Sequence, residues 1–161
     1  MNNKCITAII ASLGFVTSMW AQSREVVCLN SGWEFSRDSL FSESKMIDIP
    51  HDFQIEQPWV PPTADEKADN SDVAANIKSR LSARGFKEMG TGWYRKNITP
   101  DASMKGRRIL IDFEGIIYVG DVWLNGQHIG GTNYGYVGFE LDSTQFLRYG
   151  EPNEIKVKAN T

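Results

Sequence analysis

The stretch RILIDFEGIIYVGDVWLNGQHIG, residues Arg108–Gly130, decides the fold of this chain. Before Gly115 the apolar residues recur with a period of two, and residues 116–124 are rich in β-branched and aromatic side chains, so both runs predict strands. The second run stops at Asn125-Gly126, which is typical of a two-residue type I′ turn because both positions need a positive φ. The turn fixes the register of a hairpin, for which we expect three facing pairs: Leu124 with Gln127, Trp123 with His128, and Val122 with Ile129.

Short strand patterns recur along the rest of the chain, at Val26–Leu29, Trp33–Phe35, Lys45–Ile49, Gly90–Ile98, Tyr134–Leu141 and Glu154–Ala159. Tyr136 and Phe139 are expected to anchor the fifth of these in the core. Asp142–Gln145 has the form of a capping box and predicts one helical turn. Helical periodicity is sustained nowhere, so the sequence predicts an all-β fold, an antiparallel jelly-roll β-sandwich.

Composition excludes several classes of function. The 161 residues suffice for one domain, and a net charge of −3 with no basic run longer than Arg107-Arg108 argues against a nucleic-acid partner. Cys28 is the one cysteine outside the N-terminal apolar segment, and we expect it to be a small buried residue at the start of a strand. Because cysteine and histidine form no cluster, no metal and no cofactor is expected.

The N-terminus predicts a signal peptide over residues 1–21. Lys4 precedes an apolar run from Cys5 to Trp20, and small residues then allow cleavage after Ala21 or Ser23. The alternative is an uncleaved membrane anchor, but the run is shorter than the ~20 residues needed to span a bilayer. We therefore expect an exported protein, periplasmic or extracellular, that leaves the membrane once the signal is cleaved.

Seven motifs along the chain resemble one known family. They are LNSGWEF (Leu29–Phe35), IPHDF (Ile49–Phe53), GTGWYRK (Gly90–Lys96), FEG (Phe113–Gly115), VWLNGQHIG (Val122–Gly130), YGYVGFELDST (Tyr134–Thr144) and NEIKVKA (Asn153–Ala159). Their order and spacing are similar to those of the N-terminal sugar-binding domain of glycoside hydrolase family 2, the β-galactosidase and β-glucuronidase group. The resemblance implies that residues 24–161 are a galactose-binding-like β-sandwich domain.

In that family the chain continues through further strands, an immunoglobulin-like domain and a (β/α)₈ barrel that holds two catalytic glutamates. The resemblance therefore implies a β-galactosidase-like glycosidase whose O-glycosyl hydrolysis belongs to regions outside these residues. It also implies a sandwich incomplete at its C-terminal edge and a docking surface for the downstream domains. No catalytic residue of the family has a counterpart here. Asp112 and Glu114 lie on one face of a strand, but a solvated strand face explains them better than a catalytic pair.

Residues 58–87 form a long polar loop, longer than the plain family pattern. In related β-galactosidases a loop of this region leans over the barrel mouth, so the resemblance implies sugar contacts for Trp59, Asp69, Asn70 and Arg84. The alternative is that these are loop residues with no ligand. Trp93 and Trp123 are expected to pack between the sheets and not to stack on sugar.

Two other functions stay open on the sequence alone. One is a stand-alone, non-catalytic carbohydrate-binding module that attaches to a polysaccharide without cleaving it. The other is a structural β-domain that docks on a partner protein. Both share the predicted sandwich, so the fold does not separate them.

Overall fold

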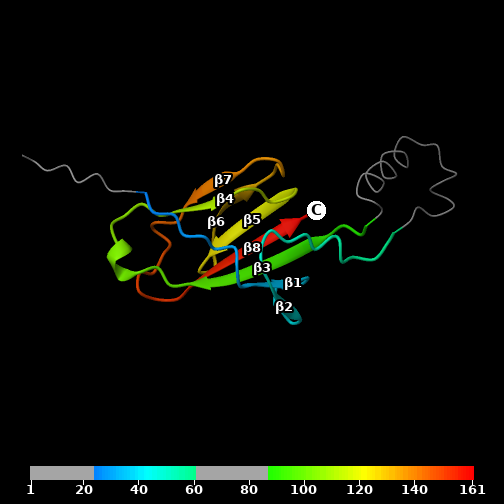
Figure 1. Cartoon of the computed structure of the whole chain (residues 1–161), viewed down its shortest axis with the longest axis horizontal. Helices are drawn as coiled ribbons and strands as arrows, with labels where there is room; N and C mark the ends of the chain where they lie inside the picture. Colours follow the sequence, from blue (N-terminus) through cyan, green and yellow to red (C-terminus); the bar gives the residue numbers. More distant parts are fainter. Residues whose placement is uncertain (1–23, 61–86) are drawn as a thin grey trace, which may run out of the picture.

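The computed structural model describes residues 24–60 and 87–161. The predicted signal peptide, residues 1–21, and most of the loop 58–87 lie outside these residues. The described part holds eight strands and one short 3₁₀ helix, and no α-helix (Figure 1). In chain order these are β1 (Trp33–Ser36), β2 (Ser44–Ile47), β3 (Thr91–Ile98), η1 (Ala102–Met104), β4 (Leu110–Phe113), β5 (Val119–Leu124), β6 (Gln127–Thr132), β7 (Phe139–Asp142) and β8 (Asn153–Asn160).

The strands form two antiparallel sheets. The larger has six strands in the order β2-β1-β3-β8-β5-β6, and the smaller consists of β4 and β7. The last strand, β8, is therefore a central one, because it pairs with β3 along one edge and with β5 along the other (Figure 1). The all-β architecture predicted from the sequence is confirmed.

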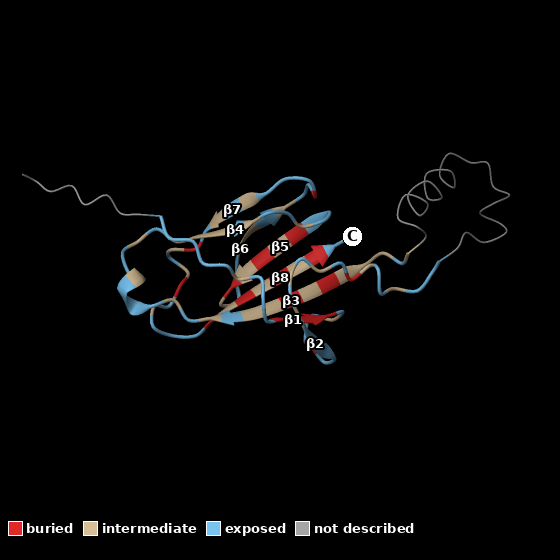
Figure 2. Ribbon diagram, viewed as in Figure 1, coloured by how far each residue is buried: buried red, intermediate tan, exposed pale blue. Residues whose placement is uncertain are grey.

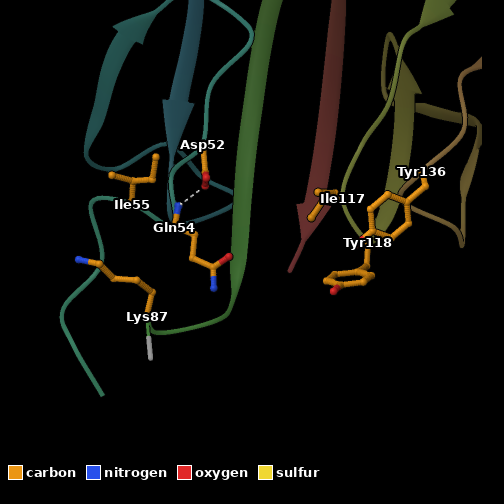
Figure 3. Close-up of a pocket in the computed structure, with 7 residues that line it drawn as sticks. All are labelled: Asp52, Gln54, Ile55, Lys87, Ile117, Tyr118 and Tyr136. Carbon is orange, nitrogen blue, oxygen red and sulfur yellow. Dashed lines mark hydrogen bonds between the residues drawn. The ribbon is translucent and has the colours of Figure 1, made fainter. Parts of the chain in front are cut away.

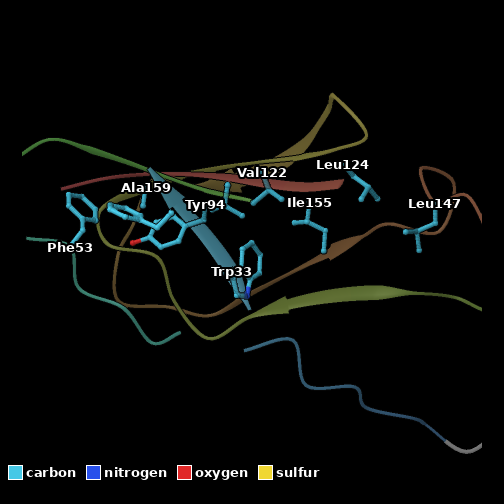
Figure 4. Packing of buried hydrophobic residues seen from close by; sticks show 10 residues of the cluster. Trp33, Phe53, Tyr94, Val122, Leu124, Leu147, Ile155 and Ala159 are labelled. Carbon is cyan, nitrogen blue, oxygen red and sulfur yellow. The ribbon is translucent and has the colours of Figure 1, made fainter. Parts of the chain in front are cut away.

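The core lies on one face of the six-stranded sheet. Ile155, Val157 and Ala159 alternate with half-buried residues along β8 and are at most 7% exposed, as their spacing predicts (Figure 2). Val122 and Leu124 extend from the neighbouring β5 on the same side and are fully buried (Figure 4). Apolar residues of β4 and β7 pack against this cluster, so the two sheets enclose one core.

The predicted hairpin forms between β5 and β6. Asn125 and Gly126 have φ values of 53° and 81°, and Leu124 faces Gln127 while Trp123 faces His128. The third expected pair is wrong: Val122 faces Gly130, because the register shifts by one residue between Val122 and Trp123. Gly130 permits this shift, since its φ is 147° and a Cβ there would lie 2.6 Å from the Leu141 side chain.

The segment before β1 is not a strand. Val26 and Val27 are 79% and 61% exposed, and Cys28 is exposed where we expected a buried thiol. The Trp33 indole donates a hydrogen bond to the Leu29 carbonyl, while Arg24 and Glu25 form ion pairs with Glu140 and Arg107 at the surface. Without pairing to a neighbouring strand, the apolar residues of this segment remain at the surface.

Trp93 and Trp123 do not pack between the two sheets. Their neighbours Tyr94, Val122 and Leu124 face the core, so the two indoles lie on the opposite, outer face of the six-stranded sheet. Their ring centroids are 5.7 Å apart, and each ring is half-buried. The outer face therefore carries an aromatic pair of its own.

The helical turn predicted at Asp142–Gln145 is replaced by a simple turn. Asp142 does cap it, since its carboxylate accepts hydrogen bonds from the Thr144 amide and hydroxyl. The Phe146 amide bonds the Ser143 carbonyl, and residues 144–146 close the turn without a helix. Phe139 packs as expected, stacked on Phe113 with ring centroids 5.0 Å apart.

Candidate functional site

A cavity of about 290 Å³ opens at the end of the molecule where β8 finishes. Four separate segments line it: one that follows β2, one that precedes β3, one that precedes β5 and one between β6 and β7 (Figure 3). The lining residues are Asp52, Gln54, Ile55, Lys87, Ile117, Tyr118 and Tyr136. Pockets that mix aromatic and polar groups in this way are where small molecules bind.

The segment after β2 is held in place by the core. Phe53 is 3% exposed and stacks on Phe35, with ring centroids 5.7 Å apart. The His51 Nδ1 atom lies 3.1 Å from the Tyr94 hydroxyl. The Asp52 carboxylate accepts a hydrogen bond from the backbone amide of Gln54, which stabilises the turn (Figure 3). These contacts fix Asp52 and Gln54 at the rim of the cavity.

Two polar atoms of this segment are buried without a hydrogen-bond partner among the described residues. They are Nε2 of His51 and Nε2 of Gln54. A buried polar atom without a partner costs about 1–3 kcal/mol, so either atom gains free energy when a partner is supplied. Gln54 lines the cavity, and a rotation of its side chain would let Nε2 donate a hydrogen bond to a hydroxyl group of a bound molecule.

Burial and hydrogen bonds set the ionisation of the Tyr94 and Glu56 side chains near His51. Burial, together with the Asp52 and Glu56 carboxylates, raises the pKa of the Tyr94 phenol, so Tyr94 stays protonated. A hydrogen bond from Lys45 lowers the pKa of Glu56, which lies 3.8 Å from His51. The described lining of the cavity itself carries one carboxylate, Asp52, and one ammonium group, Lys87, and neither forms an ion pair within the described residues.

The opposite wall is formed by exposed tyrosines. Tyr134 and Tyr136 are 60% and 68% exposed, and Tyr118 is 37% exposed. Their rings meet edge to face, Tyr136 lying 6.3 Å from Tyr118 and 5.8 Å from Tyr134. Tyr136 was expected in the core and is instead a surface residue, whereas Phe139 stacks on Phe113. Exposed tyrosine rings offer both a flat apolar face and a hydroxyl.

Of the residues predicted to contact sugar, the structure places one. Trp59 is 67% exposed, as expected, and forms a bridge with Lys87, whose ammonium lies 4.6 Å from the indole centroid. Trp59 does not line the cavity, although Lys87 does. Asp69, Asn70 and Arg84 lie outside the described residues, so their roles stay predictions.

Asp112 and Glu114, the one carboxylate pair considered from the sequence, are both exposed and do not line the cavity. Within residues 24–60 and 87–161, no three metal-ligating side chains come together. In the same ranges no helix has the length and apolar character needed to span a membrane.

Comparison with known proteins agrees with this geometry. Residues 17–160 match the family of the glycosyl hydrolases family 2, sugar binding domain. A β-glucuronidase of Bacteroides fragilis is 27% identical over 158 residues, covering 98% of this chain and 19% of that protein. A β-galactosidase of Bacteroides ovatus is 29% identical over 153 residues, covering 89% of this chain and 16% of that protein.

Solved structures give the same relationship. A glycosyl hydrolase family 2 member of Bacteroides cellulosilyticus superposes with a TM-score of 0.63 at 34% identity, covering 81% of this chain and 17% of that one. The chain thus spans less than a fifth of the length of each of these three relatives. Because the family match extends over nearly all of its residues, the chain belongs to the sugar-binding domain family of the family 2 glycosyl hydrolases.

Proposed function

We propose that this chain is the N-terminal sugar-binding part of an exported, β-galactosidase-like glycosidase. The observation that carries the proposal is the family match over residues 17–160, joined to a tyrosine-walled cavity at one end of the domain. The relatives that it resembles are a β-glucuronidase and a β-galactosidase of much greater length. Hydrolysis of the glycosidic bond would then fall to other regions of the longer enzyme.

The cavity supplies the sugar contact in this proposal. A pyranose ring would lie against the Tyr118 and Tyr136 side of the cavity, with its hydroxyl groups toward Asp52 and Gln54. The Asp52 carboxylate accepts hydrogen bonds from sugar hydroxyl groups. The side-chain amide of Gln54, whose Nε2 has no partner among the described residues, donates a hydrogen bond to a hydroxyl oxygen. These groups suit a neutral sugar, because the described lining carries one carboxylate, Asp52, and one ammonium group, Lys87, and so presents no net charge.

Titration calorimetry of the 161-residue chain with methyl β-galactoside and β-galactosyl disaccharides tests the cavity. We expect weak binding that Tyr136→Ala and Gln54→Ala each reduce by about fivefold. Met46→Ala is the matched control, because Met46 is 67% exposed on β2 and does not line the cavity. Absence of heat at tens of millimolar sugar would overturn the assignment of the cavity.

Two further measurements test the longer enzyme and its export. DNA sequence beyond the Thr161 codon should encode a barrel domain in frame. N-terminal sequencing of the secreted product should begin at Gln22 or Arg24, following cleavage after Ala21 or Ser23. A gene with no barrel-coding sequence, together with sugar binding by this chain, would instead support the free-standing binding module.

A further inference from the structure

The outer face of the six-stranded sheet carries an aromatic and basic surface that the cavity does not involve. We define this outer aromatic face by four residues: Trp93 on β3, Trp123 on β5, and Lys156 and Lys158 on β8. The register places them on adjacent strands, with Trp93 opposite Lys158 and Trp123 opposite Lys156. All four are half-buried, so each keeps part of its surface in contact with solvent.

Both lysines are held beside the same indole. The Lys156 and Lys158 ammonium groups lie 5.0 Å and 5.9 Å from the Trp93 ring centroid. The loop after β1 fixes Lys156 further, since its ammonium donates to the Ser39 carbonyl and lies over Phe41, a residue only 8% exposed. The two positive charges are therefore positioned by the fold.

Neither lysine is neutralised by a carboxylate. On the same side Arg95 bonds Glu34 at 2.7 Å, and Asp121, which the register places opposite Lys158, lies 3.1 Å from Nε2 of His128. In the described ranges of the chain, no carboxylate oxygen lies within 4.0 Å of the Lys156 or Lys158 ammonium. A chain with a net charge of −3 thus keeps two adjacent lysines without a close ion pair beside a half-buried tryptophan pair.

We propose that the outer aromatic face binds a sugar chain that carries carboxylates, that is, a uronate-containing glycan. The apolar face of a sugar ring packs on the Trp123 indole, while the uronate carboxylate forms ion pairs with the Lys156 and Lys158 ammonium groups. Charge complementarity selects this ligand over a neutral glycan, which would leave both cations unpaired. The proposal is independent of the cavity, which lies at the end of the domain and whose polar groups suit neutral sugar.

Calorimetry with a galacturonate tetramer and with its fully methyl-esterified form tests the proposal on the 161-residue chain. We expect the acid to bind and the ester, which has the same rings without the charge, to bind at least about fivefold more weakly. Binding of the acid should also weaken as salt rises from 50 to 500 mM. Equal binding of acid and ester would overturn the proposal, as would no binding of either at millimolar concentration.

Variants place the site on this face. Trp123→Ala should weaken binding about tenfold, and Lys158→Gln, a surface change that leaves the core intact, about fivefold. Lys105→Gln removes the same charge from an exposed position beyond η1 and should change nothing. Tyr136→Ala should also leave uronate binding intact, which separates this site from the cavity. Retained binding in both Trp123→Ala and Lys158→Gln would refute the proposal and leave the face as a contact for another protein domain.

Discussion

Asn153 illustrates how much a single buried polar residue determines in this fold. Its side chain is 1% exposed and makes four hydrogen bonds. It accepts from the Arg148 amide and from the Asn125 side chain, and it donates to the Arg148 and Glu151 carbonyls. Asn125 in turn accepts from the Glu154 amide, so the hairpin turn and the start of β8 are tied together.

Asn153→Ala should lower the free energy of unfolding by about 3 kcal/mol, because it leaves several buried backbone groups without partners. Urea denaturation followed by tryptophan fluorescence measures the loss. Asn97→Ala is the matched control, since Asn97 is an exposed asparagine of β3, and its effect should stay within about 0.5 kcal/mol. Equal effects of the two changes would show that the network contributes nothing.

Asp142 gives the fold a defined dependence on pH. The Thr144 hydroxyl, the Arg108 guanidinium and the Thr144 amide all donate to its carboxylate and lower its pKa from 3.8 to about 2. A carboxyl pKa lowered by folding stabilises the folded state above the unfolded value of 3.8, and this contribution is lost as the pH falls toward 2.

Asp142→Asn should therefore reduce the urea midpoint at pH 6 and have progressively less effect as the pH falls from 4 to 2. The measurement is a set of urea titrations of both proteins across this range. Thr144→Val removes the hydroxyl donor and should raise the pKa of Asp142. The pH range over which this carboxylate changes the stability of the fold then becomes narrower. A difference in midpoint that does not change between pH 6 and pH 2 would contradict the assignment.

At the scale of single elements, the β5–β6 turn is governed by local chemistry. Gly126 has a φ of 81°, and a Cβ built there meets nothing within 4 Å, so only backbone strain opposes a larger residue. Gly126→Ala should destabilise the chain by about 1 kcal/mol. Gly115→Ala is the control, because Gly115 has no positive φ and its Cβ would lie at an ordinary 3.9 Å from the Gly135 carbonyl. Thermal melts compare the two, and a larger loss in Gly115→Ala would show that this account of the turn is wrong.

The same hairpin shows which features were predictable from sequence. Asn125-Gly126 predicted the turn because both residues adopt its φ values with no help from the rest of the protein. The shift that pairs Val122 with Gly130 was not predictable, since it depends on Leu141 of β7 occupying the space beside Gly130. Pairing within an element is local, whereas its irregularities depend on tertiary contacts.

Aromatic residues were misplaced for a related reason. Alternation along β3 assigns Trp93 and Tyr94 to opposite faces of the sheet. Because each face then carries an aromatic ring, the pattern does not say which face is turned to the core. Trp59 is exposed and bridges Lys87 but does not line the cavity. The tyrosine wall was missed because Tyr136 was expected to anchor the core, and the local pattern of the sequence does not show that its ring lies at the surface.

At the scale of the whole molecule, the chain presents an apolar end. Ile117, Tyr118 and Val119 before and at the start of β5 are each at least 37% exposed, as are Tyr136 and Val137. Among the strands that the structure describes, β4 and β7 each have one edge without a pairing partner. Exposed apolar patches and open strand edges favour association.

The 161-residue chain should therefore self-associate as its concentration rises, in a way that Tyr136→Ser reduces. Size-exclusion chromatography with light scattering, at protein concentrations from about 5 to about 200 µM, measures this association. Met46→Ser, on the exposed strand β2, is the comparison variant. A monodisperse monomer across the range would refute the expectation.

The central position of β8 has a consequence for the order in which the protein can be made. Every other described strand leaves the ribosome before residues 153–160, yet β3 and β5 meet only through this strand. Until it emerges, β2-β1-β3 and β5-β6 are separate pieces with exposed inner edges. The nascent chain should thus complete its larger sheet in a single step once β8 has emerged, and until then its open strand edges are exposed to neighbouring chains.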